Sequence, residues 1–194
     1  MAKRLVIASG NAGKLREYRE LLANTGFELV AFDTEVDEAG ETYAENARLK
    51  AEAACGRSEL PALGDDSGVE VDVLGGFPGL HSARLAPTQV ERTAELLQRL
   101  EGKPRPWAAR FVCVVVLAAP ARPTLFFEGE CQGEIVPEWR GEAGFGYDPV
   151  FLVAGTGKTF GEMPPEEKRL YSHRARAVRA LLESGALQRL SAPA

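Results

Sequence analysis

The sequence predicts an α/β protein built around a mixed β-sheet, and two patterns support this fold class. In residues 4–100, short apolar runs alternate with amphipathic segments, an order typical of strands connected by helices. In residues 109–132, two longer apolar-rich runs flank a proline-rich turn, which predicts an antiparallel hairpin. The chain has 194 residues, of which 45% are hydrophobic, so one domain with an ample core is expected.

Four elements are expected in the first 55 residues. A buried strand over 4–8 runs into a glycine-containing turn and then into a helix that ends near Ala23. A short strand follows over 29–32. Thr42 and Glu45 match the capping-box pattern, which predicts the start of a helix that ends near Cys55.

The remaining elements alternate in the same way. Two short strands, 60–63 and 69–73, are expected on either side of an acidic turn at 64–68. The pattern continues with a loop over 75–79, a helix over 87–100 and hairpin strands over 109–118 and 124–132. It ends with a glycine-aromatic loop over 141–147, a strand over 150–153 and a helix over 174–184 that is capped by Ser172.

Composition excludes several classes of protein. The net charge of −5 argues against a nucleic-acid partner, and the longest apolar run, 111–119, is too short to span a membrane. The beginning of the chain has no signal-peptide pattern. Its three cysteines lack the spacing of a zinc site or a disulfide framework, and its two histidines exclude a histidine cluster. We therefore expect a soluble protein of the cytoplasm.

The acidic segment Gly64-Asp65-Asp66-Ser67-Gly68 is the first candidate site. Adjacent carboxylates raise each other's cost of ionisation unless a cation neutralises them, and Mg²⁺ prefers carboxylate oxygens. The segment is therefore a candidate metal site. The alternative is an ordinary surface turn, because aspartate, serine and glycine are common turn residues.

A second candidate site lies where the first strand passes into the first helix. The backbone amides at a helix N-terminus suit phosphate, glycines allow close approach, and a lysine adds a full positive charge. The residues concerned are Ser9, Gly10, Asn11, Ala12, Gly13 and Lys14. Their spacing differs from a Walker A loop, so an ordinary tight turn is the alternative.

Polar residues around the second helix allow two interpretations. Glu38 and Glu41 lie in a glycine-containing loop, where either could reach a metal ion, whereas Glu45 is explained by capping. Asn46 and Lys50 are four residues apart and share one helix face. On an alanine-rich helix, such residues are expected to face solvent.

Two further groups suit a nucleotide. Phe145 lies between glycines in a loop, where an aromatic ring can stack on a base, and Asp148 can accept hydrogen bonds from a base or ribose. Folding of Phe145 into the core is the alternative.

A basic group is expected at the head of the last helix, where cations oppose the helix dipole; it consists of Lys168, His173 and Arg174. Such a placement favours an anionic or carbonyl-rich ligand, and simple solvation is the alternative.

Taken in order, these segments resemble the inosine triphosphate pyrophosphatase family. The resemblance covers residues 5–182 and rests on five segments: SGNAGK, EAGETYAENARLKA, GDDSGVEVDVLGGFPGLHSAR, GEAGFGYDPVF and EEKRLYSHRARA. It implies hydrolysis of inosine, deoxyinosine and xanthosine triphosphates between the α- and β-phosphates, a Mg²⁺ requirement and a homodimer. We expect one domain over 1–194, built on a mixed sheet flanked by helices, with two lobes around a central cleft.

The resemblance also implies roles for individual residues. Glu38 and Asp66 would bind metal, and Asp66 would accept a proton, with Asp65 in support. The triphosphate would contact residues 9–14 and Lys50, and Ser67 would be a further substrate contact. The base and sugar would contact Phe145, Gly146, Tyr147 and Asp148, and the purine would be read by Lys168, His173 and Arg174.

One position departs from the family pattern. Members commonly carry Glu-Thr-Gly where this chain has Glu38-Ala39-Gly40, so Glu41 is the alternative to Glu38 as a metal ligand. Two other functions are considered: a pyrophosphatase for modified pyrimidine triphosphates, and a non-catalytic nucleotide-binding module. A pure binding module has no need of Asp66 and Glu38 together.

Overall fold

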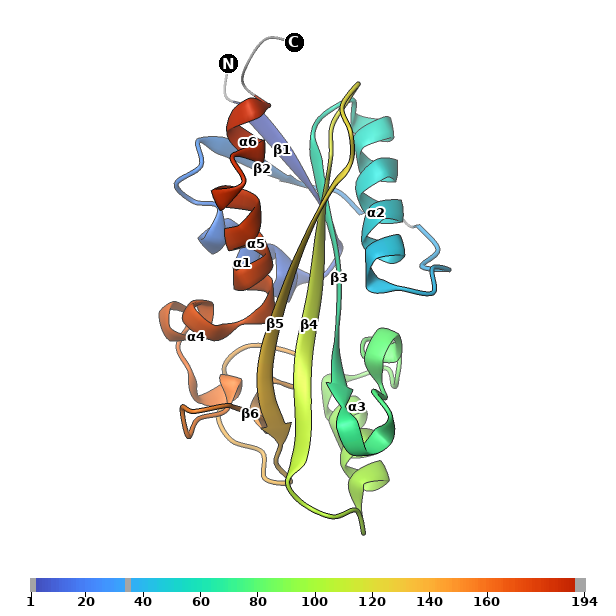
Figure 1. Ribbon diagram of the computed structural model, residues 1–194, viewed down its shortest axis with the longest axis vertical. Helices are drawn as coiled ribbons and strands as arrows, with labels where there is room; N and C mark the ends of the chain where they lie inside the picture. Colours follow the sequence, from blue (N-terminus) through green and yellow to red (C-terminus); the bar gives the residue numbers. More distant parts are fainter. Residues whose placement is uncertain (1–2, 34–35, 191–194) are drawn as a thin grey trace. The chain divides into compact units, whose positions relative to one another are not determined.

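The fold is an α/β arrangement around one mixed sheet, as predicted. A computed structural model describes residues 3–33 and 36–190 (Figure 1). Within these residues the sheet has six strands in the order β2-β1-β3-β4-β5-β6, in which β1 is parallel to β2 and β3, and β5 is antiparallel to β6. The strands are β1 (Lys3–Ala8), β2 (Phe27–Ala31), β3 (Ala62–Val71), β4 (Trp107–Ala118), β5 (Leu125–Ile135) and β6 (Phe151–Val153).

The four predicted helices occur in the predicted order, and two short helices are added, one before and one after the last long one. The helices are α1 (Ala12–Leu21), α2 (Tyr43–Ser58), α3 (Gln89–Leu100), α4 (Pro165–Tyr171), α5 (His173–Glu183) and α6 (Ala186–Arg189). Short 3₁₀ turns lie at η1 (Asp72–Leu74), η2 (Gly79–His81), η3 (Asp148–Val150) and η4 (Phe160–Glu162).

The chain divides into two compact units. The first unit comprises Met1–Asp66, Cys113–Gly129 and Arg174–Ala194, and the second unit comprises Ser67–Val112 and Glu130–His173. The chain therefore passes from one unit to the other within β3, β4 and β5, and again at the start of α5.

In the first unit, strand alternation divides the apolar side chains between two cores. Leu5 and Ile7 of β1 pack in a cluster with residues of α1, α5 and α6, whereas Val6 and Ala8 pack with residues of α2. Because successive strand residues point to opposite faces, helices are needed on both sides of these strands. Figure 1 shows α2 on one side of β1 and β3, and α1 with α5 on the other.

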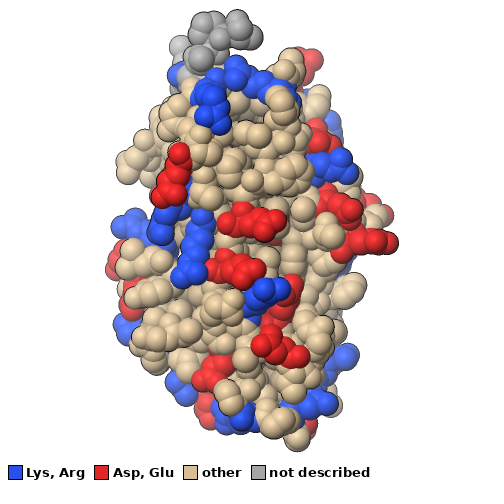
Figure 2. Space-filling view, viewed as in Figure 1, with Lys and Arg blue, Asp and Glu red and all other residues tan. Residues whose placement is uncertain are grey.

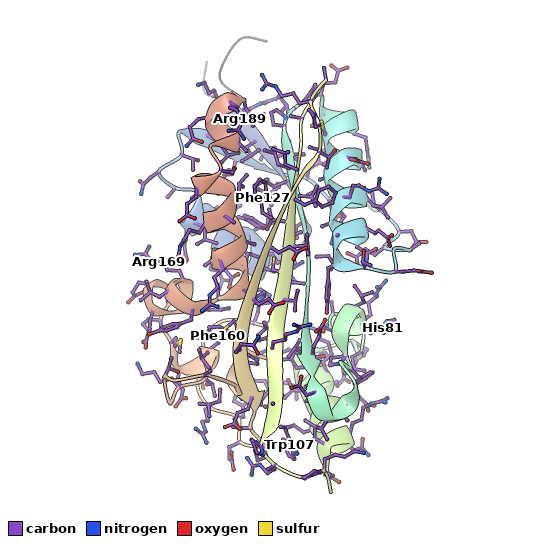
Figure 3. The ribbon with its side chains drawn as sticks, in the orientation of Figure 1. His81, Trp107, Phe127, Phe160, Arg169 and Arg189 are labelled. Atoms are coloured by element: carbon purple, nitrogen blue, oxygen red, sulfur yellow. The ribbon has the colours of Figure 1, made fainter. Side chains whose placement is uncertain are left out.

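The second unit has a separate core that is rich in aromatic rings. Phe111 lies 4.5 Å from Phe151 and 6.1 Å from Phe160, measured between ring centroids. Phe160, labelled in Figure 3, is fully buried in this cluster. Helix α3 adds Leu96 and Leu100, and its start is fixed by a complete capping box.

On the face drawn in Figure 2, basic and acidic side chains are interspersed. In the second unit, the Arg110 guanidinium contacts the carboxylates of Glu70 and Glu130 at 2.8 and 3.2 Å. Within 3–33 and 36–190, no helix is long and apolar enough to cross a membrane.

The acidic segment is not a turn, and this prediction was wrong. A single strand, β3, runs through Asp65, Asp66 and Ser67, and both aspartates are buried at 2% and 7% exposure. Turn-forming residues can lie in a strand when pairing and side-chain partners outweigh their local preferences. Here the pairing of β3 with β1 and the cationic partners described below supply that stabilisation.

The capping box at α2 is only half formed. The Thr42 hydroxyl accepts a hydrogen bond from the Glu45 amide at 3.1 Å, as predicted. The Glu45 carboxylate instead accepts from the backbone amide of Glu41, at 2.7 Å. The cap therefore fixes the loop one residue further upstream than the pattern predicts.

Candidate functional site

The parallel pairing of β1 and β3 places the turn that follows β1 beside the two aspartates. Ala8, the last residue of β1, pairs with Gly64, so β3 continues into Asp65 and Asp66 where β1 ends. Helix α1 then begins, with the Asn11 side chain accepting from the Lys14 amide at 3.0 Å. The Lys14 ammonium lies 3.2 Å from Oδ2 of Asp65.

Asp65 points toward α1 and α5, where it is bound by cations. Arg174, at the start of α5, donates from Nε and Nη2 to Asp65 Oδ2 at 3.0 and 2.8 Å. Its Nη1 donates to the Glu17 carboxylate of α1 at 2.6 Å. Both side chains of the Arg174–Asp65 pair are only 1% exposed. The guanidinium is therefore directed to two carboxylates of the first unit.

Asp66 points to the opposite face, toward α2. Asn46 donates from Nδ2 to Asp66 Oδ2 at 3.1 Å, and the Lys50 ammonium lies 3.8 Å from Oδ1. Asn46 and Lys50 are 0% and 8% exposed, so the expectation from composition alone that they face solvent was wrong. The two adjacent acids thus have different partners, as expected for neighbouring residues of a strand.

These surroundings shift the pKa values of the two acids in opposite directions. Burial opposes ionisation of Asp65, but Lys14, Arg174 and Lys50 outweigh it and hold its pKa well below the usual value. Burial raises the pKa of Asp66, and Lys50 and Lys14 offset this only in part. Such divergence is typical of acid–base sites, in which one carboxylate stays ionised and the other exchanges a proton.

Glu38 belongs to the same cluster as Asp66. The Lys50 ammonium lies 2.7 Å from Glu38 Oε1, so one cation contacts both carboxylates. Glu41 is exposed, and its backbone amide is bound to Glu45. Among the described residues, no cluster of three or more histidine, cysteine, aspartate or glutamate side chains could hold a metal. Two carboxylates that converge on one cation nevertheless fit Mg²⁺, which commonly takes one or two protein carboxylates plus phosphate oxygens.

The second unit contains a buried ion pair beside an aromatic loop. Lys168 donates from Nζ to Asp148 Oδ2 at 2.6 Å, and the Phe145 amide donates to the same oxygen at 2.7 Å. The Lys168 ammonium also lies 4.9 Å from the centroid of the Phe145 ring and 5.4 Å from that of Phe160. The Phe145 ring is thus half-buried next to a cation, in a loop whose backbone is bound to Asp148.

Lys168 lies on α4 rather than at the head of the last helix, because Pro165 begins a separate seven-residue helix. Its neighbour Arg169 is exposed and lies on the outer side of α4 (Figure 3).

The other predicted residues of the second unit are also located. The His173 ring stacks on Phe111 with centroids 4.6 Å apart and planes 9° from parallel. Tyr147 is buried and donates from its hydroxyl to the Ser82 carbonyl at 2.9 Å, whereas Ser67 is half-buried in β3. Gly146 adopts a positive φ of 65° next to Tyr147.

Sequence reasoning missed two residues of the first unit. Asn46 was assigned to a solvated helix face, and Glu17 was not singled out at all. The signal for Asn46 was its spacing of four residues from Lys50 on a helix rich in small residues, which can pack closely on a strand. Nothing local marked Glu17, because its partner Arg174 is 157 residues away in the chain.

Comparison with known proteins identifies the family. The model of the Ham1 family matches residues 5–184, and the chain belongs to this family. A dITP/XTP pyrophosphatase of Gloeobacter violaceus is 50% identical over 184 residues, covering 94% of each chain. One from Thermus thermophilus is 48% identical over 190 residues, covering 93% of this chain and 91% of the relative.

Solved structures agree with this assignment. A HAM1 protein from Coxiella burnetii has a TM-score of 0.85 and 36% identity, covering 95% of this chain and 98% of that one. A nucleoside-triphosphatase / dITP/XTP pyrophosphatase from Mycobacterium abscessus has a TM-score of 0.72 and 36% identity, covering 93% and 98%.

Proposed function

We propose that this protein is a Mg²⁺-dependent pyrophosphatase that converts non-standard purine nucleoside triphosphates (dITP, XTP and ITP) to the monophosphate and pyrophosphate. The observation that carries the proposal is the pair of adjacent buried aspartates with opposite surroundings, in a chain about 50% identical to dITP/XTP pyrophosphatases. Removal of such nucleotides from the nucleotide pool is the physiological role that follows.

Asp66 is the proposed proton acceptor. Water attacks phosphorus at the bridge between the α- and β-phosphates, and Asp66 takes the proton of that water as the new P–O bond forms. The P–O bond of the bridge breaks, which releases the monophosphate and pyrophosphate. Burial raises the pKa of Asp66 toward neutral pH, and a general base works best when its pKa lies near the working pH. Asp65 stays ionised beside it and fixes Lys14.

Glu38 and Asp66 are the proposed metal ligands. When bound, Mg²⁺ supplies charge neutralisation at the phosphate oxygens. Lys14, the turn over 9–13 and Lys50 are proposed to bind the triphosphate, because they provide two ammonium groups and the amides at the start of α1.

The second unit is proposed to bind the base and sugar. Phe145 offers a ring for stacking, and Lys168 and His173 supply donors for the 6-oxo group of hypoxanthine and xanthine. Adenine carries an amino donor at that position, so buried donors would be left unpaired, a mismatch that can discriminate by about 10⁴-fold. For Arg174 we propose a role at Asp65, since its guanidinium is bound there.

A product assay tests the proposal. The protein is incubated with Mg²⁺ and equal concentrations of XTP, dITP, ATP, GTP and TTP, and pyrophosphate and orthophosphate are measured separately. Pyrophosphate mainly from XTP and dITP is expected, and none without Mg²⁺. Release of orthophosphate, or equal turnover of ATP, would refute the proposal. A homodimer in the cytoplasm is proposed from the family resemblance, and light scattering on the purified protein tests the dimer.

A further inference from the structure

The side-chain amide of Asn46 connects the two carboxylates that are the proposed metal ligands. Asn46 is fully buried on α2. Its Oδ1 accepts a hydrogen bond from the Gly40 amide at 2.8 Å, and its Nδ2 donates to Asp66 Oδ2 at 3.1 Å. Gly40 follows Glu38 by two residues, so one amide group bonds both to the loop that carries Glu38 and to Asp66.

The chemistry of the two contacts requires an amide. A backbone N–H can only donate and an ionised carboxylate can only accept, so the residue between them must accept on one side and donate on the other. Asparagine does both, and only one orientation of its amide satisfies both partners. Aspartate would place a second negative charge against Asp66, and an aliphatic residue would leave two buried polar groups without this partner.

Helix capping does not account for this residue. Thr42 is the N-cap of α2, and Asn46 lies four residues further on, where its own backbone amide makes a regular helical bond to the Thr42 carbonyl at 3.1 Å. Asparagine is unfavourable in a helix interior, because its side chain competes for backbone hydrogen bonds. Its burial there is consistent with a role at Asp66.

Close packing fixes the distance over which Asn46 acts. A Cβ on Gly64 of β3 would lie 2.4 Å from the Ala47 carbonyl oxygen and 2.6 Å from the Ala51 amide, so α2 rests directly on the strand backbone. Gly64 and Asp66 point to the same face because they are two residues apart. Asp66 is therefore held within reach of Asn46 and Lys50.

We propose that Asn46 is a positioning residue for the metal site. By holding Asp66 Oδ2, it directs Oδ1 toward the Lys50 ammonium, at 3.8 Å, and by holding Gly40 it keeps Glu38 at the same ammonium, at 2.7 Å. Loss of the amide releases both ligands from their common geometry. The proposal deepens the proposed function and rests on its assignment of Glu38 and Asp66 as metal ligands.

The test measures binding of Mg²⁺ to the whole protein by isothermal titration calorimetry, without nucleotide. Asn46→Ala is expected to weaken Mg²⁺ binding by about 10- to 100-fold, the usual cost of removing a group that orients a metal ligand. Gly40→Ala is expected to weaken it as well, because the new Cβ would lie 2.7 Å from Asn46 Oδ1. Asn24→Ala, the same substitution at an exposed asparagine, is the matched control and should bind as the wild type does.

Both substitutions remove the same hydrogen bond between Gly40 and Asn46. The double variant should therefore bind Mg²⁺ no more weakly than whichever single variant has the lower Mg²⁺ affinity. Wild-type affinity in Asn46→Ala overturns the proposal, even if its melting temperature falls, because a merely structural residue would lower stability alone. If Asn46→Ala does not fold, Gly40→Ala decides, and wild-type affinity there overturns the proposal. A wild-type protein that binds no Mg²⁺ refutes the metal assignment itself, and the proposal with it.

Discussion

Replacement of Arg174 by leucine is expected to destabilise the protein strongly, although the substitution exchanges a charged residue for an apolar one in a buried position. The Arg174 and Asp65 side chains are each 1% exposed, and Glu17 is 17% exposed. Loss of the guanidinium leaves Asp65 as a buried carboxylate, and breaking a buried ion pair from one side costs about 3–5 kcal/mol. Lys14 still contacts Asp65, so we expect about 3 kcal/mol.

The dependence on pH has a definite sign. Because the folded pKa of Asp65 is lowered, its contribution to stability is present above the unfolded pKa of about 4 and is lost as pH falls toward the folded value. In Arg174→Leu, less positive charge compensates for the burial of Asp65, so the folded pKa of Asp65 rises. The stability difference between wild type and variant should therefore be largest at neutral pH and narrow below about pH 4.

Urea denaturation followed by circular dichroism at pH 7 and pH 3 measures both effects. Arg174→Lys is a useful comparison, since a single ammonium cannot reproduce the three donations of the guanidinium and should give an intermediate loss. Arg179→Leu, at an exposed position of the same helix, should change stability by less than about 0.5 kcal/mol. An Arg174→Leu protein within about 1 kcal/mol of wild type at pH 7 would refute the reasoning.

Two further predictions concern packing and alkaline pH. Gly64→Ala should lower the free energy of unfolding by at least about 2 kcal/mol, because its Cβ meets the backbones of Ala47 and Ala51, whereas Gly56→Ala has open space on α2 and should raise it by about 0.5–1 kcal/mol. Equal melting temperatures for these two variants would contradict the close contact of α2 with β3. Burial raises the pKa of Tyr147 to about 12, so stability present below pH 10 should be lost as pH rises toward 12, and less so in Tyr147→Phe. Burial also raises the pKa of Tyr18, so ultraviolet titration at 295 nm should show one fewer late-ionising phenol in the variant than in the wild type. An unchanged titration curve would disprove the shift.

The order of elements was predictable from the sequence, because periodicity and turn chemistry are local. Helix α3 shows this well, since the predicted range of 87–100 nearly coincides with the observed helix, Gln89–Leu100. The continuous strand through Asp65 and Asp66 was not predictable in the same way. Local preferences favoured a turn, and the cations that stabilise the strand come from α1, α2 and α5.

For the candidate site, the sequence indicated which residues lie together better than it indicated their hydrogen-bond and ion-pair partners. The family resemblance selected Lys14, Lys50 and Asp66, and the structure brings these residues together around β3. The same reasoning directed Arg174 to the purine, whereas the structure directs its guanidinium to two carboxylates. Which partner a long side chain takes depends on the packing of distant segments, and a single sequence holds no direct record of that packing.

The most direct test of the proposed function is the release of pyrophosphate from XTP by Asp66→Asn. Asparagine keeps the size of the side chain but cannot accept the proton of the attacking water, and general-base catalysis typically contributes about 10²–10⁴-fold. We predict that pyrophosphate release with saturating XTP and Mg²⁺ falls by at least about 100-fold, while XTP still binds in equilibrium dialysis. Release within about threefold of the wild-type rate would contradict the assignment of Asp66 as the proton acceptor.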